Sequence, residues 1–241
     1  MSCQHCIRQN GEPFSADTQL HAEVPDTEAE GWKRLLELVE MAAADRRKTF
    51  APFAEMTLEA QSHVITLPPT IARLKSVRHL ELYGSSLVRI PPEIGEMENL
   101  REFTPYTSYA LHWFPYEITR CARLARSTVS IRALYGNYNY RPPFPRLEKP
   151  LSSTAGFDLS NLPPERYGAP AITMCSVCRA PLAHTGLHQV WISLKVATDV
   201  LPLLVNACSV HCVARLPSAA RGYVPGPHTG GLSIEQPARR H

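Results

Sequence analysis

Two stretches of the sequence decide the fold: LPPTIARLKSVRHL at residues 67–80 and IPPEIGEMENLREF at residues 90–103. Each begins with an aliphatic residue and two prolines, and apolar residues then recur in both at an offset of 23 positions. The matching positions are Leu67 and Ile90, Ile71 and Ile94, Leu74 and Met97, Val77 and Leu100, and Leu80 and Phe103. A repeat of this length is typical of solenoids, in which each unit buries its apolar edge against the next.

Each repeat is predicted to combine a short strand with a return segment. Leu80 and Leu82 alternate with polar residues, which predicts a strand with these two side chains inward. The prolines at 91 and 92 end strand pairing, because proline has no N–H to donate. The next apolar residues lie three apart and predict a helical return segment packed against the strand: Ile94, Met97 and Leu100.

The pattern from Val77 to Ile94 resembles the leucine-rich-repeat family, with one departure. Ser85 stands where that family usually has Asn or Cys, whose side chain bonds the backbone of the turn. The resemblance implies an α/β fold containing a short leucine-rich-repeat solenoid. It also implies a protein-interaction module that uses the concave face of the strands, although a fold alone does not establish a function.

Weaker copies of the repeat flank the best one. Residues 56–58 align with residues 80–82 as an earlier strand, and residues 113–118 align with the proline-containing segment as a later repeat. Val129 and Ile131 are predicted to form a last strand. Three repeats make a short solenoid, which needs capping at both ends.

An N-terminal helix is predicted to supply one of these caps. Thr27 and Glu30 have the spacing of a capping box. Apolar residues follow at helical spacing from Trp32 to Ala43, and the helix is expected to end near Arg47. We expect it to cover the open edge of the first repeat.

Composition divides the chain into five parts. Residues 1–26 are acidic and predicted to be a flexible segment, and residues 27–140 contain the capping helix and the repeats. Seven prolines between 141 and 170 predict a semi-rigid linker. Residues 171–231 are predicted to form a zinc-finger module, and residues 232–241 a polar tail.

Four cysteines in the second module have the spacing of a metal site. Cys175 and Cys178 form a CxxC pair, and after 29 intervening residues Cys208 and Cys212 form a CxxxC pair. Two such pairs can bring four sulfurs onto one tetrahedral zinc ion, with zinc–sulfur distances of about 2.3 Å. The seven cysteines are an odd number, which favours metal binding over a disulfide framework.

The residues between the two cysteine pairs predict two strands, at 190–194 and 201–205. A cysteine knuckle, a hairpin and a helix carrying the last ligands resemble the treble-clef zinc finger. Alternatives remain at this point: the four thiols are simply buried and reduced, or a histidine replaces one sulfur. The histidines considered are His184, His188 and His211.

Two further features of the cysteines and charges bear on function. Cys3 and Cys6 form a second pair beside His5, which either binds a metal with a distant ligand or binds nothing. The net charge of +3 gives no electrostatic case for nucleic-acid or membrane binding.

No apolar run approaches 18 residues, so we expect a cytoplasmic protein without a membrane segment.

The expected binding surface is the row of side chains that alternate with the buried strand residues. The row carries four carboxylates (Glu55, Glu59, Glu81 and Glu102) and two tyrosine rings, and its only possible cation is a histidine. We therefore expect a protein partner that presents basic residues. The partner-binding residues predicted are Glu59, His79, Glu81, Tyr83, Glu102, Thr104 and Tyr106.

Two other functions remain as alternatives. The chain could be an enzyme with zinc or Cys121 as its reactive centre, but four sulfur ligands leave no open position for water. The sequence also contains no GxSxG, HExxH or Gly-rich phosphate loop. The zinc module could touch nucleic acid, but its cationic residues are few and scattered.

Overall fold

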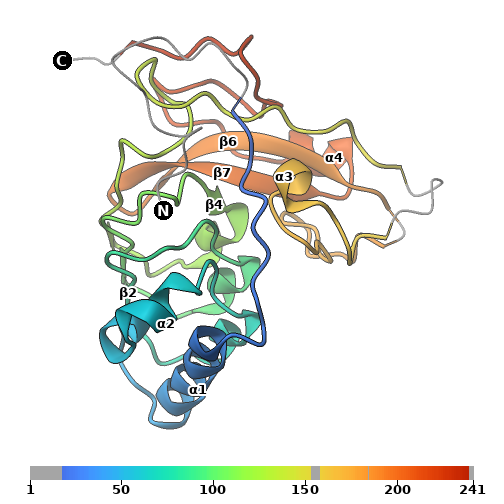
Figure 1. Cartoon of the computed structure of the whole chain (residues 1–241). Helices are drawn as coiled ribbons and strands as arrows, with labels where there is room; N and C mark the ends of the chain where they lie inside the picture. Colours follow the sequence, from blue (N-terminus) through green and yellow to red (C-terminus); the bar gives the residue numbers. More distant parts are fainter. Residues whose placement is uncertain (1–17, 153–157, 184, 239–241) are drawn as a thin grey trace. The chain divides into compact units, whose positions relative to one another are not determined.

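The computed structural model describes residues 18–152, 158–183 and 185–238. These residues divide into two compact units, and Figure 1 draws the chain coloured along its sequence. The repeat unit contains residues 24–133 and 195–200, and the cysteine unit contains the remaining described residues. Within the described residues the fold is mixed α and β, with one four-stranded and one three-stranded sheet.

The repeat unit is built on a parallel sheet of four short strands in chain order. These are β1 (Thr49–Phe50), β2 (His79–Glu81), β3 (Glu102–Thr104) and β5 (Arg126–Ser127). In the register, Leu80 lies opposite Phe50 on one side and Phe103 on the other. All three side chains are fully buried, so the predicted inward row at Leu80 and Phe103 is confirmed.

The strands β2, β3 and β5 are each preceded by a five-residue 3₁₀ helix that begins after a proline in extended conformation. These helices are η2 (Pro69–Arg73), η3 (Pro92–Glu96) and η4 (Tyr116–Arg120), and a shorter one, η1, spans Pro52–Glu55. The return segments are therefore 3₁₀ rather than α-helical. Each repeat has only a short return segment between its strands. A 3₁₀ helix rises more per residue than an α-helix, so it covers the required length with fewer residues.

A ladder of serine hydroxyls occupies the turn after β2 and β3. Ser85 Oγ lies 2.6 Å from Ser108 Oγ, which donates to the Leu82 carbonyl at 3.0 Å. Both serines are buried. Hydroxyls therefore satisfy the backbone of this turn at the position where the leucine-rich-repeat pattern usually has Asn.

The first and last strands differ from the sequence prediction. Residues 56–58 do not form a strand, because Thr57 caps the helix α2 (Leu58–Ser62) by accepting a bond from Ala60 N at 3.2 Å. Leu58 is 84% exposed, so its predicted inward position is wrong. The first strand is β1, and the last strand is β5 rather than Val129 and Ile131.

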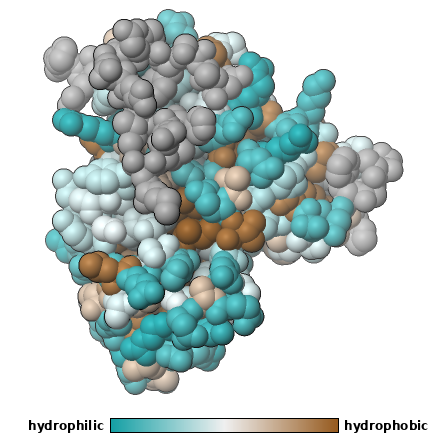
Figure 2. All heavy atoms as spheres, in the orientation of Figure 1, coloured by the Kyte–Doolittle hydropathy of each residue, from teal (hydrophilic) through white to brown (hydrophobic). Residues whose placement is uncertain are grey.

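The helix α1 (Glu30–Ala44) packs against α2 and η2, and its buried side chains include Trp32, Leu35 and Val39. It begins after Ala29 without a side-chain cap, so the predicted capping box at Thr27 is wrong. Gly31 is required at the contact with α2, because a Cβ there would lie 2.1 Å from the Ala60 carbonyl oxygen. Figure 2 shows a mainly hydrophilic surface around α1 and α2.

The cysteine unit contains two long strands, β6 (His188–Val196) and β7 (Asp199–Ala207), which are neighbours in one sheet. The two predicted strands are thus confirmed. Short helices α3 (Pro164–Tyr167) and α4 (Val210–Ala214) also belong to this unit. The remaining two-residue strand, β4 (Phe114–Pro115), belongs to the repeat unit.

The proline-rich segment differs from its predicted role as a linker, because part of it packs onto β6. Phe144 is buried with its ring centre 5.6 Å from that of Trp191. The Trp191 indole N–H donates to the Pro145 carbonyl at 2.9 Å. Prolines that cannot join a sheet here supply carbonyl acceptors and apolar surface to the core instead.

Candidate metal centre

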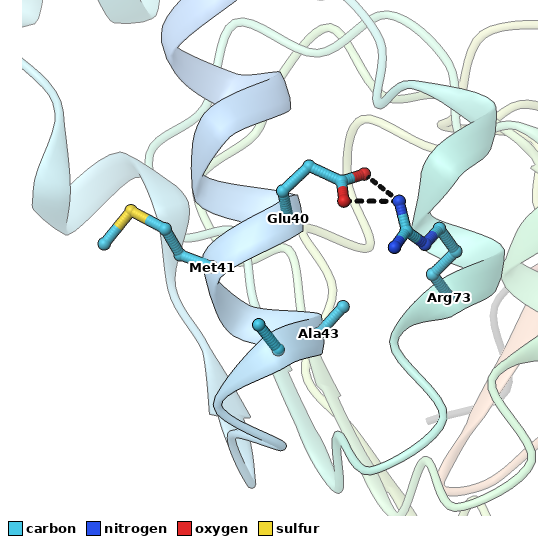
Figure 3. Close-up of a pocket in the computed structure, with 5 residues that line it drawn as sticks. Glu40, Met41, Ala43 and Arg73 are labelled. Carbon is cyan, nitrogen blue, oxygen red and sulfur yellow. Dashed lines mark hydrogen bonds and ion pairs between the residues drawn. The ribbon is translucent and has the colours of Figure 1, made fainter.

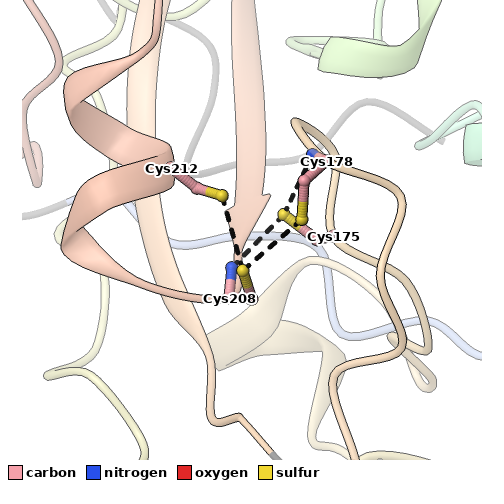
Figure 4. Close-up of side chains that lie close together, drawn as sticks. All are labelled: Cys175, Cys178, Cys208 and Cys212. Carbon is pink, nitrogen blue, oxygen red and sulfur yellow. Dashed lines mark hydrogen bonds between the residues drawn. The ribbon is translucent and has the colours of Figure 1, made fainter.

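Four cysteine side chains converge at one end of the cysteine unit (Figure 4). Cys175 and Cys178 lie on a turn, Cys208 follows the end of β7, and Cys212 lies on α4. Their four sulfur atoms all lie within 4.8 Å of one another. The two sequence pairs predicted to share one site are therefore brought together.

The spacing of the sulfurs fits a tetrahedral ion. The Sγ atoms of Cys178 and Cys208 are 3.6 Å apart, and those of Cys208 and Cys212 are 3.4 Å apart. Four sulfurs around an ion at 2.3 Å would be about 3.8 Å apart. The described cysteines are all free thiols, so no disulfide competes for them.

Backbone N–H groups are directed at the sulfurs. The amides of Cys178 and Cys208 donate to Cys175 Sγ at 3.5 and 3.4 Å. Ser209 caps α4 by accepting a bond from Cys212 N at 3.3 Å, which fixes the last ligand relative to Cys208. Amides that donate to sulfur favour the thiolate over the thiol.

The turn that carries Cys175 and Cys178 closes although Arg179 stands where such turns often have glycine. Arg179 adopts the left-handed conformation with φ of 62°. Its amide donates to the Cys175 carbonyl at 3.0 Å, and Cys175 N donates to the Ala180 carbonyl at 2.8 Å. The knuckle geometry is thus formed at the cost of backbone strain at one residue.

Charge at the site is unevenly distributed among the thiols. The backbone bond from Ala180 lowers the pKa of Cys178 to about 7, and this side chain is exposed. Burial raises the pKa of Cys208, and burial together with the neighbouring sulfurs raises the pKa of Cys212 to about 12. Four thiolates this close together require a cation, which is the chemical reason for expecting a bound metal.

Histidines do not join the described cluster, which consists of cysteines alone. His188 lies at the start of β6 and His211 is exposed on α4. His184, and the pair Cys3 and Cys6 with His5, lie outside the described residues. The remaining described cysteine, Cys121, is buried against the Ile94 carbonyl, and burial raises its pKa to about 12.

The predicted binding row is present along β2 and β3, with one residue misplaced. His79, Glu81, Glu102 and Thr104 are half-buried beside the buried Leu80 and Phe103. Tyr83 and Tyr106 are 58% and 47% exposed, with ring centres 6.1 Å apart. The prediction for Glu59 is wrong, because this residue lies on α2 and not on a strand.

Arg126 is a member of the row that sequence reasoning missed. It lies opposite Glu102 in the register of β3 and β5, and its guanidinium contacts the Glu102 carboxylate at 2.7 Å. His79 Nε2 lies 3.0 Å from Thr104 Oγ1 in the same row. The offset of 24 between Glu102 and Arg126 was the available signal, but the last strand was predicted three residues too late.

A shallow pocket beside α1 contains no comparable chemistry. It is lined by Glu40, Met41, Ala43, Ala44 and Arg73. Figure 3 shows that Glu40 and Arg73 point toward each other and form an ion pair, whereas Met41 points away. The two charged groups therefore satisfy each other.

Comparison with known proteins leaves the chain's relationships open: no family model, curated protein or solved structure matches it. Among the described helices, none is long and apolar enough to cross a membrane. Two features therefore bear on function: the metal centre, and the strand row, by which we mean the side chains of His79, Glu81, Tyr83, Glu102, Thr104 and Tyr106 along β2 and β3.

Proposed function

We propose that this chain is a non-enzymatic protein-interaction scaffold of the leucine-rich-repeat type with a structural zinc site. The observation that carries the proposal is the pairing of two features. One is a half-exposed row of polar and aromatic side chains on a rigid parallel sheet. The other is a cluster of four cysteine sulfurs with no further ligand among the described residues.

Zinc is the proposed metal because of the ligand set. Four thiolates favour zinc or an iron–sulfur cluster, and a single tetrahedral ion matches sulfurs that lie 3.4 and 3.6 Å apart. A site closed by four sulfurs leaves no position for a reacting water. The knuckle, the β6–β7 hairpin and α4 occur in the order of a treble-clef-like module, and reduced thiols suit a cytoplasmic location.

The solenoid interpretation is supported by regularity within the repeat unit. Residues at 23-position intervals are buried, make equivalent strand pairs and are followed by equivalent proline-initiated 3₁₀ helices. The serine pair in the turn repeats at the same interval. A helix at the first repeat, α1, takes the place of a cap.

The strand row is the proposed partner surface. Glu102 is already paired with Arg126, so Glu81 is the carboxylate left for a basic group on a partner. Tyr83 and Tyr106 add exposed rings that supply apolar contact area beside the charge. The proposed partner is therefore a protein segment that combines a basic residue with apolar side chains, rather than a uniformly basic surface.

Metal analysis and affinity purification test the two halves of the proposal separately. We expect one zinc per chain in purified protein, and its absence would remove the structural-site proposal. For the partner surface, Tyr83→Ala should lose a bound protein that the parent retains. Tyr109→Ala is the matched control, since Tyr109 is 67% exposed and lies outside the strand row. Equal loss or equal retention by the two variants would count against the strand row.

A further inference from the structure

A cationic residue stands immediately before each of the strands β1, β2 and β3. Lys48, Arg78 and Arg101 hold this position in successive repeats. Arg78 N donates to the Lys48 carbonyl at 2.7 Å, and Arg101 N donates to the Arg78 carbonyl at 2.7 Å. The three residues are therefore neighbours on one rung of the sheet, and we name them the cationic column. Ala125 ends the column, since its amide bonds the Arg101 carbonyl at 2.9 Å.

The three side chains of the cationic column are exposed and unpaired. None of them makes a hydrogen bond or ion pair with another described side chain. Glu81 makes no ion pair among the described residues, whereas three other carboxylates close to the column in sequence already have other cations as partners. These pairs are Asp45 with Arg47 at 3.3 Å, Glu98 with Lys75 at 3.3 Å, and Glu102 with Arg126 at 2.7 Å.

Like charges on one rung of a sheet repel one another, and no described side chain forms an ion pair with these three. Adjacent strands lie about 4.8 Å apart, so the column places three positive charges over about 10 Å. Because the residues hold equivalent positions and make equivalent backbone bonds, their side chains leave the sheet in the same direction. The column thus places three positive charges side by side at one end of the strands.

We propose that the cationic column binds an acidic α-helix of a partner protein, lying across the strands. Carboxylates at helix positions i, i+4 and i+7 share a face and span about 10.5 Å, which matches the span of the column. Alternate residues of an extended peptide would place three carboxylates over about 13 Å, which fits less well. The column shares no residue with the strand row and has the opposite charge, so the inference does not depend on the function proposed above.

The test uses full-length protein and a labelled alanine-based helical peptide of about 20 residues, with glutamates at i, i+4 and i+7. Fluorescence anisotropy should detect binding that weakens as salt is raised. The combined variant Lys48→Ala, Arg78→Ala and Arg101→Ala should bind about tenfold more weakly, as expected for the loss of three exposed charge pairs.

A control variant keeps the same change in net charge away from the column. It combines Arg132→Ala, Lys149→Ala and Arg221→Ala, which are all exposed. This control should bind the peptide like the parent. Unchanged melting curves for both triple variants would show that the sheet is intact.

Three results would overturn the proposal. The first is equal weakening of binding by the column variant and the control variant. The second is equally tight binding of a peptide whose glutamates are distributed around the helix. The third is tighter, column-dependent binding of a single-stranded oligonucleotide, which would assign the column to nucleic acid instead.

Discussion

In the repeat unit the same positions are apolar in successive repeats, whereas the cysteine unit has no internal repeat and gathers its core from distant segments. Leu80 lies between Phe50 and Phe103 in the strand register, and all three side chains are fully buried. Trp191 in the cysteine unit instead contacts Phe144 and Tyr135, more than forty residues earlier in the chain. The first unit is stabilised by periodic burial, and the second is expected to depend on a metal in addition to its core.

Removing the metal should cause the largest loss of stability. The loss should be confined to the cysteine unit and leave the repeat unit folded. Binding to structural zinc sites contributes about 10–16 kcal/mol in model peptides, so Cys208→Ser should unfold the metal end of the cysteine unit. We expect hydrogen exchange to rise across α4 and the Cys175 turn while β2 and β3 stay protected. A variant that keeps its zinc, or protection that is lost equally in β2 and α4, would contradict this comparison.

The next prediction concerns a core position in the repeat unit. Leu80 is fully buried between Phe50 and Phe103, so Leu80→Ala should lower the free energy of unfolding by about 2–5 kcal/mol. Its half-buried neighbour Glu81 serves as the control, and Glu81→Ala should change it by less than about 0.5 kcal/mol. Denaturant melts that give similar losses for both variants would mean that the strand faces are assigned incorrectly.

Sequence reasoning worked best where a physical requirement is local and failed where it depends on distant register. The clustering of the four cysteines was predicted from their spacing, and the inward row was predicted from the 23-residue offset. The first strand was misplaced because α2 lengthens the first repeat, so that Thr49 and His79 pair at an offset of 30. Two contacts can be recognised only in the folded structure: the ion pair of Glu102 with Arg126, and the packing of Phe144 on Trp191.

Acid should destabilise the cysteine unit through His228. Burial lowers the pKa of this histidine from 6.5 to about 4. Its Nδ1 accepts a bond from Gly230 N at 3.2 Å, so the proton sits on Nε2, which is buried without a partner among the described residues. The unfolded chain therefore binds a proton more readily, and stability falls as the pH drops from 6.5 to 4.

The full loss attributable to His228 is roughly 3 kcal/mol, at about 1.4 kcal/mol per pH unit. Zinc release in acid would add to it, so the measurement compares the parent with His228→Gln at each pH. The difference between the two proteins should change by roughly 1 kcal/mol between pH 7.5 and 5.5, in the direction of a less stable parent. A difference that stays constant over this range would remove His228 as the cause.

The smallest predicted effect is at the cysteine knuckle and would stabilise the protein. Arg179 holds a left-handed φ of 62°, which costs a residue with a side chain roughly 1–2 kcal/mol relative to the right-handed region. Glycine adopts this conformation freely but loses more entropy on folding. We therefore expect Arg179→Gly to raise the free energy of unfolding of zinc-loaded protein by roughly 0.5–1 kcal/mol.

The matched control is Arg215→Gly, since Arg215 lies at the end of α4 with φ of −87° and has no such strain to relieve. Glycine should therefore destabilise at 215 and stabilise at 179, and thermal melts in which both variants lose stability would show that the knuckle is not strained at Arg179.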